Sequence, residues 1–546
     1  MSEQQTTNPI ALSTADVQRF PEVSTGMLEP TAEAPRISSR LLEGLKWIFS
    51  FPAMLGTFLF GRVFYELRGF IVDPDVWWHI KNGQTIIATR HWPTVDPYSF
   101  TVSGTPWLAY EWLGDVAIGY VGKFGLQALA ALLMGLGGAI AIALYYYASL
   151  CARNSKAGFV SAAIVSIFAI GNFNLRPQMF GALFLVITLI VLERFRQGHP
   201  KALWILPPLF LLWINSHGSW IIGLGVMLVA LVGGLFEFQI GSIEGVRWTE
   251  KERIQLEAAL LGCLVVIPVT PYGTRLATYP FLVASSLPLN MENVLEWFPM
   301  PFNMWWGKLF LAVIVGAFLL QAVYHFNFRL QQWVLAIGGT VMACIHIRFV
   351  LLFSPFFAPV LAVMLARWLQ RYHREKDKYV LNAVLMAGAV FAMVWYFPTR
   401  SGLEHGVEKQ FPVRAVNFLL SHPTEGQLFN AYNYGGYLIA YLPEHKVFID
   451  GRGDLYELGG AFGDYLQIAG LKPAAFSVLK SYGIRTCLME RGAPLAVVLA
   501  VHPDWKQIYH DDQSVIFIRR ESPSAVAGER ASQSSTTRSE HESPAD

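Results

Sequence analysis

Long apolar runs recur along most of this 546-residue chain, and they restrict its fold more than any other feature. Hydrophobic residues make up 53% of the chain and charged residues only 15%, where a soluble protein carries roughly a quarter charged residues. A helix needs about 20 mostly apolar residues to cross a bilayer, and several runs here are shorter or interrupted by Pro and Gly. We therefore predict an α-helical polytopic membrane protein with about 11 transmembrane helices, near Leu45–Phe64, Leu126–Leu150, Ala157–Phe173, Met179–Leu192, Leu203–Ile214, Trp220–Phe236, Ala258–Val269, Trp305–Tyr324, Trp333–Ile345, Phe349–Leu365 and Tyr379–Phe397.

Basic residues in alternate connections predict the orientation of these helices. They gather in five short connections, at Arg153 and Lys156; Arg194, Arg196 and Lys201; Arg247, Lys251 and Arg253; Arg329; and Arg367, Arg371, Arg374, Lys376 and Lys378. Connections rich in Lys and Arg stay in the cytoplasm. The N-terminus is then cytoplasmic, and everything after Phe397 lies outside the plasma membrane, which in a bacterium is the inner membrane.

The other connections carry the unusual polar residues. These are Asp73, Asp75, His79, Asp96, Glu111, Arg176, Asn215, His217, Arg275, Glu292, Glu296 and Arg348. Ionisable residues at membrane depth are costly and usually line a cavity or a functional pathway. The pattern indicates a functional site on the extracytoplasmic face.

Composition divides the chain into four parts. We expect a disordered cytoplasmic tail over residues 1–44, a transmembrane domain over 45–397 with an outer first loop over 65–125, an extracytoplasmic α/β domain over 398–520, and a disordered tail over 521–546. In the α/β part, "KVFIDGR", "IRTCLMER" and "SVIFIRR" are typical of strands, whereas "GGYLIAYL" and "PAAFSVLKSYG" are typical of helices. The last segment is rich in Ser, Glu and Ala and has no apolar periodicity.

Several classes of protein and site are disfavoured. The net charge of +2 gives no sign of a nucleic-acid partner. The four cysteines are scattered without a CxxC spacing, which implies neither a zinc site nor a disulfide framework. The cytoplasmic connections contain no nucleotide-binding loop.

The stretch "VDPDVWWHI" holds the first candidate acids. Asp73 before Pro74 is a good helix start, which gives Asp73 a capping role as an alternative to chemistry. Asp75 and His79 would then share one helix face, and Trp77 or Trp78 could belong to an interfacial aromatic belt. For Asp75 the alternatives are a solvated or capping role and a carboxylate at the mouth of a cavity.

The remaining candidates also have two interpretations each. Glu111 lies between Tyr110 and Trp112, where it could hold a sugar or simply meet interfacial water. Arginines suit phosphate because the guanidinium donates two parallel hydrogen bonds, yet each could instead snorkel or pair with a carboxylate. His217, in a very short turn, could bind a ligand or cap a helix. "GRGD" at residues 451–454 is too short a match to an adhesion motif to carry weight.

The motifs together resemble the GT-C superfamily of integral-membrane glycosyltransferases. The match covers roughly 45–520 and rests on the acidic first loop "DPDVWWHIKNGQTI" and on "RPQMF", "NSHGSW", "NVLEWF" and "FNAYNYGGYL…KVFIDGRGDLY". Within the superfamily, the chain is most similar to bacterial polyprenyl-phosphate-sugar-dependent transferases of the protein mannosyltransferase and aminoarabinose transferase type. Many of those proteins have Asp-Glu after the loop proline, where this chain has Asp-Val.

The resemblance implies a function and roles for the candidates. It implies a transfer, with inversion, from a polyprenyl-phosphate-linked sugar to an extracytoplasmic glycan, lipid or protein of the cell envelope. Asp75 would be the general base, with Asp73 and Glu111 as the other catalytic candidates. The donor's phosphate or sugar would be bound among His79, Arg176, Asn215, His217, Arg275, Glu296 and Arg348. No metal ligands are assigned, a divalent cation is left open, and a secondary transporter and a non-catalytic assembly protein are the alternative functions.

Overall fold

The computed structural model describes residues 39–69 and 71–520. The chain forms two compact units, one up to Ile48 and one from Phe49 on. In the first unit the structure describes the helix α1 (Ser39–Ile48). Residues 39–44 of the predicted disordered tail therefore lie in a helix, because "SRLLEGLKWI" has the apolar spacing of an amphipathic helix. The rest of that tail and the predicted tail 521–546 lie outside the described residues.

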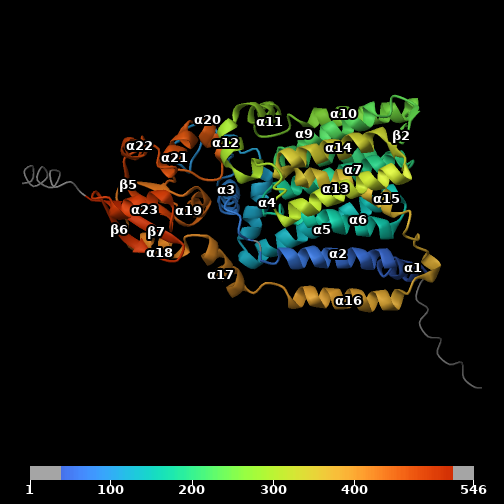
Figure 1. The fold of residues 1–546 in the computed structure, drawn as a ribbon, viewed down its shortest axis with the longest axis horizontal. Helices are drawn as coiled ribbons and strands as arrows, with labels where there is room; N and C mark the ends of the chain where they lie inside the picture. The colour runs from blue at the N-terminus through green and yellow to red at the C-terminus, as the bar shows by residue number, and fades with distance from the viewer. Residues whose placement is uncertain (1–38, 70, 521–546) are drawn as a thin grey trace, which may run out of the picture. The chain divides into compact units, whose positions relative to one another are not determined.

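A bundle of apolar helices makes up most of the second unit (Figure 1). Its members are α2 (Phe51–Leu67), α5 (Leu126–Ala152), α6 (Ser155–Ile170), α7 (Gln178–Arg196), α8 (Leu206–Ser216), α9 (Trp220–Val232), α10 (Glu250–Val266), α13 (Trp305–Tyr324), α14 (Leu330–Ile345), α15 (Val350–Leu365) and α16 (Tyr379–Trp395). Ten of the predicted spans fall mainly on one of these helices, whereas the span predicted at Leu45–Phe64 covers the end of α1 and most of α2. Of the described helices, four are long and apolar enough to cross a membrane alone, or up to six if each of two bent pairs counts as one span. The predicted number of crossings is therefore not established.

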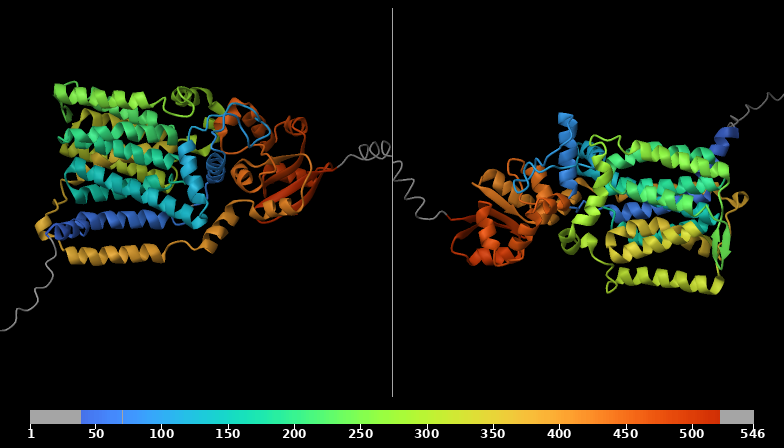
Figure 2. Two further views of the ribbon diagram at one scale, coloured as in Figure 1. Left: turned by 180° about the vertical axis from the view of Figure 1, so that it is seen from behind. Right: turned by 90° about the horizontal axis from the view of Figure 1, so that it is seen from above.

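Short helices from several connections gather at one end of this bundle (Figure 1). They are α3 (Val76–Thr89), α4 (Trp112–Gly122), α11 (Arg275–Ser286) and α12 (Pro288–Asn293), with 3-10 turns at Leu295–Trp297 and Ile347–Phe349. Figure 2 shows the opposite end, which holds a small sheet of β1 (Phe238–Ile240), β2 (Ile243–Gly245) and β3 (Phe328–Arg329). The connections that carry the candidate residues thus share one end of the bundle.

The C-terminal segment contains a four-stranded sheet in the order β4-β5-β7-β6. Its strands are β4 (Gln427–Asn430), β5 (Ile484–Glu490), β6 (Trp505–His510) and β7 (Ser514–Arg519), and β4 pairs parallel with β5 while the other pairs are antiparallel. The segment also contains α17 (Arg400–Gln410), α18 (Val413–Ser421), α19 (Gly435–Tyr441), α20 (Gly453–Leu458), α21 (Ala461–Ala469), α22 (Ala475–Ser481) and α23 (Pro494–Val501). The patterns expected to be strands form β5 and β7, and those expected to be helices form α19 and α22.

The predicted strand "KVFIDGR" is the exception. Val447 makes a single parallel bridge with Ser99 of the first loop, and Thr101 Oγ1 donates to the carbonyl of Phe448 at 2.6 Å. Val447, Phe448 and Ile449 are fully buried. The apolar character of this stretch therefore reflects its burial between the sheet and the first loop, not a strand. The C-terminal segment belongs to the same compact unit as the bundle.

Candidate active site

Asp75 stands directly before helix α3, and its carboxylate is left out of the helix cap. Asp73 Oδ1 accepts the backbone N–H of Asp75 at 2.9 Å. This bond closes a turn through Pro74, so the helix begins at Val76 rather than at Pro74 as the sequence predicted. Within the described chain, the buried side chain of Asp75 makes no capping bond, which leaves its carboxylate for other contacts.

Arg176 brings three carboxylates together around one guanidinium. Its Nε lies 2.8 Å from both oxygens of Asp73. Its Nη1 lies 3.1 Å from Asp75 Oδ2 and 2.8 Å from Glu296 Oε1. Arg176 precedes α7, and Glu296 belongs to the 3-10 turn before α13, so three separate connections meet here. One positive charge faces three carboxyl groups, an arrangement that favours a bound proton on one of them.

Asp75 and Glu296 have opposite pKa shifts within this cluster. Burial raises the pKa of Asp75 to about 6; Arg176 opposes this rise and Asp73 adds to it. The Arg176 guanidinium lowers the pKa of Glu296. A base with a pKa near the working pH is both ionised and able to accept a proton. Asp75 therefore has the properties of a general base, whereas Glu296 is a fixed anion.

A close crossing of α3 and α4 positions His79. A Cβ on Gly83 would overlap the backbone carbonyl of Asp115, and one on Gly119 would overlap the backbone of α3. Because both positions are glycine, His79 Nδ1 comes within 2.6 Å of Asp115 Oδ1. Asn82 donates to the second oxygen of Asp115 at 2.7 Å. Asp115 thus orients the imidazole and leaves Nε2 facing the site.

Glu111, the residue before α4, lies between two histidines. Its Oε2 is 3.9 Å from His79 Nε2, and its Oε1 is 3.4 Å from His217 Nε2. Burial raises the pKa of Glu111 well above its usual range and lowers the pKa of His217 to about 3. His217 Nδ1 lies 2.7 Å from the hydroxyl of Ser219. The contact between Glu111 and His217 therefore joins a neutral histidine to a carboxyl group that readily holds a proton.

The other predicted residues differ in their surroundings. Arg348 is half-buried and stacks over the Trp297 ring at 4.3 Å, and its charge acts on the neighbouring His217. Asn215 accepts from Trp112 Nε1 at 2.8 Å and donates to two backbone carbonyls, which places it in a structural junction. Arg275 is exposed at the first residue of α11, and none of the described contacts joins it to the cluster.

The two tryptophans of the first loop do not form an interfacial belt. Trp77 and Trp78 are buried, with 1% and 7% of their surface exposed. The Trp77 ring packs edge-on against Phe411 at 5.4 Å and Tyr437 at 5.3 Å, both from the C-terminal segment. The expectation of a membrane-facing role was wrong because sequence position alone does not show what covers a side chain.

Sequence reasoning missed Asp115, Asn82 and the turn around "GRGD". Asp450 and Arg452 are fully or almost fully buried. Arg452 contacts both oxygens of Asp450, at 2.8 and 2.6 Å, and its Nη1 lies 2.6 Å from Asp96 Oδ1 in the first loop. The signal was present in the sequence, because charged residues that directly follow a buried apolar run need partners.

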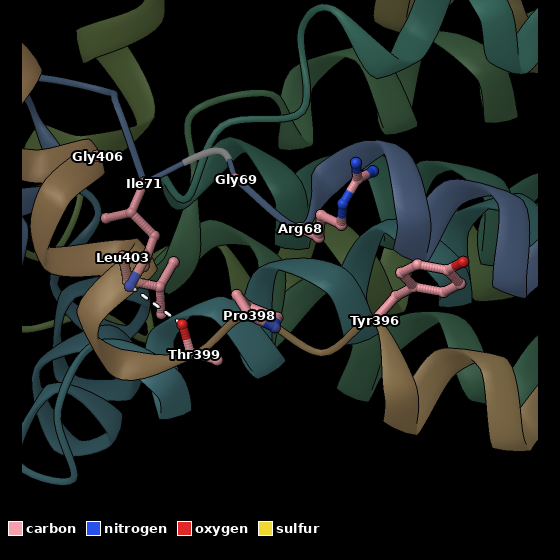
Figure 3. A pocket seen from close by; sticks show the side chains of 9 residues that line it. Arg68, Gly69, Ile71, Tyr396, Pro398, Thr399, Leu403 and Gly406 are labelled. Atoms are coloured by element: carbon pink, nitrogen blue, oxygen red, sulfur yellow. Dashed lines mark hydrogen bonds between the residues drawn. The ribbon is translucent and has the colours of Figure 1, made fainter.

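A cavity of about 300 Å³ lies beside the first loop, between the end of α2 and the start of α17 (Figure 3). Arg68, Ile71, Tyr396 and Leu403 contribute to its lining. Thr399, also on its wall, caps α17 by accepting the N–H of Gly402 at 3.2 Å. The predicted site residues are not among its lining residues, so we assign the candidate active site to the Arg176 cluster.

Metal binding does not fit the side chains as they are arranged. Over residues 39–69 and 71–520, no group of three or more His, Cys, Asp or Glu side chains could hold a metal ion. Asp73, Asp75 and Glu296 converge on a guanidinium instead. We derive no step through a divalent cation.

Comparisons with known proteins find similarity to solved structures alone. No protein-family profile and no curated protein matches the chain. Solved structures with a similar fold include the oligosaccharyltransferase AglB from Archaeoglobus fulgidus, the arabinofuranosyltransferase AftD from mycobacteria and ArnT from Cupriavidus metallidurans. All three are glycosyltransferases of the GT-C superfamily.

These similarities concern the overall arrangement of elements. AglB aligns at TM-score 0.49 and 11% identity, over 85% of this chain and 74% of AglB. AftD aligns at 0.46 and 13%, over 89% of this chain and 40% of AftD. ArnT aligns at 0.37 and 16%, over 88% of this chain and 98% of ArnT. One AglB structure holds an inhibitory peptide and a dolichol-phosphate, and the ArnT structure holds undecaprenyl phosphate.

Proposed function

We propose that this chain is a membrane glycosyltransferase that moves a sugar from a polyprenyl-phosphate-linked donor to an acceptor outside the cytoplasm. The observation that supports this most directly is Asp75, a buried carboxylate with a pKa of about 6 held 3.1 Å from Arg176. Such a group is suited to taking a proton from a hydroxyl at neutral pH. A lipid-linked donor fits a site at the end of an apolar helix bundle, because the lipid tail can remain among the helices.

In the proposed reaction Asp75 removes the proton of the acceptor hydroxyl. The hydroxyl oxygen then forms a bond to the anomeric carbon, while the bond from that carbon to the phosphate oxygen breaks on the opposite face. The departing lipid phosphate takes the electron pair, and the configuration of the sugar inverts. Arg176 holds Asp75 in place through Nη1 and is itself fixed by Asp73 and Glu296.

The phosphate side of the proposed site is formed by Arg348 and His217. Arg348 presents a guanidinium held over the Trp297 ring, and His217 is kept neutral by burial, which lowers its pKa. A guanidinium can meet two phosphate oxygens at once, whereas a neutral imidazole can donate one hydrogen bond. Arg176 is already surrounded by carboxylates, so we assign it to positioning Asp75 and not to the phosphate.

The finer expectations on topology belong to the same proposal. We propose about 11 membrane crossings, a cytoplasmic N-terminus and a bacterial inner-membrane location, with residues 398–520 and the active site outside. Support comes from the fold, since the connections with the candidate residues share one end of the bundle and the basic connections near β1, β2 and β3 lie at the other (Figures 1 and 2).

Replacing Asp75 by Asn tests the function. Asn keeps the size of the side chain but cannot accept the proton, so release of undecaprenyl phosphate from a panel of undecaprenyl-phosphate-linked sugars should fall by about 10²-fold or more. Binding of undecaprenyl phosphate should be unchanged. Asp73→Asn retains an acceptor for the Asp75 N–H but loses the charge and one of the two oxygens that face Arg176, so the loss of activity should be smaller. Full activity of Asp75→Asn would overturn the proposal.

A further inference from the structure

The backbone of Gly451 lies directly against the Asp75 carboxylate. A Cβ built on Gly451 would overlap Asp75 Oδ1, and its three nearest heavy atoms all belong to Asp75. Likewise, a Cβ on Gly436 would overlap the carbonyl oxygen of Pro74. Neither glycine has the positive φ that favours glycine. Close approach to the first loop, and not backbone strain, is therefore what requires glycine at both positions.

We propose that the turn of residues 450–453 is part of the active site. In this turn Gly451 positions the Asp75 carboxylate, and Arg452 holds the turn against the first loop. This inference rests on the proposed function, because it assigns a positioning role relative to the base of that reaction. The C-terminal segment is then a component of the catalytic centre and not an appended module.

Arg452 supplies the first anchor of the turn. Its side chain is 2% exposed and bridges Asp450 of the turn to Asp96 of the first loop. Its guanidinium also lies 4.7 Å from the centre of the Trp107 ring. A buried arginine between two carboxylates with fixed geometry holds its partners firmly, because losing either partner would leave a buried charge unpaired.

A second anchor ties the same turn to the segment that carries Glu296. Glu457 of α20 accepts the backbone N–H groups of Leu289 and Asn290, at 2.7 and 2.8 Å. Asn290 in turn donates to the carbonyl of Gly453 at 2.9 Å. The turn therefore joins the first loop, which holds Asp75, to the connection that holds Glu296.

Several charged and titratable groups face Asp75 from the elements packed against it. They are Arg176 before α7, Asp73 in the first loop, His79 on α3, Glu296 before α13, and Glu111 and Tyr432, whose pKa values are raised mainly by burial and further by Asp75. Among these neighbours, Gly451 limits where the carboxylate can go. Moving the carboxylate away from the turn therefore changes the field that sets its pKa.

The first test is Gly451→Ala in the full-length protein. The added methyl group displaces the carboxylate, and a displacement of about 1 Å lowers the rate by roughly 10- to 100-fold. The midpoint of the pH–rate profile should fall from about 6, because the displaced carboxylate leaves its most buried position. The matched control is Gly463→Ala in α21, where a Cβ would make an ordinary 3.8 Å contact with Leu289; its rate and midpoint should equal those of the wild type.

The second test needs no activity. If the methyl group of Gly451→Ala meets Asp75, then that substitution should lower the thermal unfolding midpoint in the wild type and lower it much less in an Asp75→Ala background. A double-mutant cycle of this kind measures the coupling between two residues in contact. Independent effects of the two substitutions on the unfolding midpoint would overturn the inference.

The two tests separate this inference from the proposed function. An inactive Asp75→Asn together with a Gly451→Ala variant of wild-type rate and pH profile would refute the positioning role while leaving the function intact. A fully active Asp75→Asn would refute the function, and the cycle of unfolding midpoints would still decide whether Gly451 and Asp75 are coupled. If Gly451→Ala does not fold in the wild type but folds in the Asp75→Ala background, the contact is supported.

Discussion

Replacing Arg176 by Gln should shift the midpoint of the pH–rate profile to a higher pH. The guanidinium is the positive group that faces Asp73, Asp75 and Glu296. An opposite charge at this distance lowers the pKa of a carboxyl group by about 1 to 3 units. Its removal should therefore move the pKa of Asp75 from about 6 to between roughly 7 and 9.

The sign of the effect follows from the proposed role of Asp75. A general base acts only when ionised, so the rate should rise with pH through the pKa of Asp75. At pH 7 the ionised fraction should fall from about 90% to between roughly 50% and 1%, because each unit of pKa is a factor of 10 in the equilibrium. The lost rate should return as the pH is raised through the new midpoint. The variant also loses the ion pairs of Arg176, which should lower the free energy of unfolding by about 3 kcal/mol. This is the lower end of the usual range for a buried pair, because Arg176 is 21% exposed.

The assay is release of undecaprenyl phosphate between pH 5 and 10 from purified, folded protein, with a thermal unfolding midpoint recorded for each variant. For Arg176→Lys the midpoint of the pH–rate profile should lie between those of the wild type and Arg176→Gln, since an ammonium cannot reach three carboxylates as a guanidinium does. The exposed Arg275→Gln is the matched control and should leave the pH profile unchanged. A rate for Arg176→Gln that is reduced by the same factor at every pH would refute this reasoning.

Two further predictions concern the donor and the membrane. Arg348→Ala should weaken binding of undecaprenyl phosphate, measured by titration. Arg348→Lys should restore binding poorly, because an ammonium neither donates two parallel hydrogen bonds to phosphate nor stacks on Trp297 in the same way. Full recovery with Lys would mean that charge alone matters. A reporter that is active only outside the cytoplasm should be active when fused after Phe397 and inactive when fused at Arg196; the reverse pattern would put the proposed site on the wrong side.

Local patterns in the sequence predicted the regular elements well. The apolar runs fall on the bundle helices, and "IRTCLMER" and "SVIFIRR" form β5 and β7. These elements follow from short-range periodicity, which needs no knowledge of distant neighbours. "KVFIDGR" has the same apolar character but is not a strand, since its partner in the first loop lies 347 residues away. The number of membrane crossings could not be read in the same way, because several helices are short.

The candidate site shows the same limit. Asp75 directly precedes α3 and His79 lies in its first turn, and the backbone N–H of His79 bonds to the Asp75 carbonyl at 3.1 Å. Arg176 also lies in the predicted region, yet it meets carboxylates and not an open phosphate site. A sequence shows that an arginine is present near the membrane, but its charge partners come from other connections and depend on the tertiary fold.

The bond between Arg452 and Asp96 spans 356 residues of sequence and has a consequence for biosynthesis. During translation, Asp75 and its helix emerge early, whereas the turn that holds the carboxylate is among the last parts to be made. Contacts between such distant segments form late, because a long loop must close first. A partly synthesised chain would thus carry the proposed base, Asp75, without its support. Under the proposed function, transfer would begin only when the C-terminal sheet has folded onto the first loop.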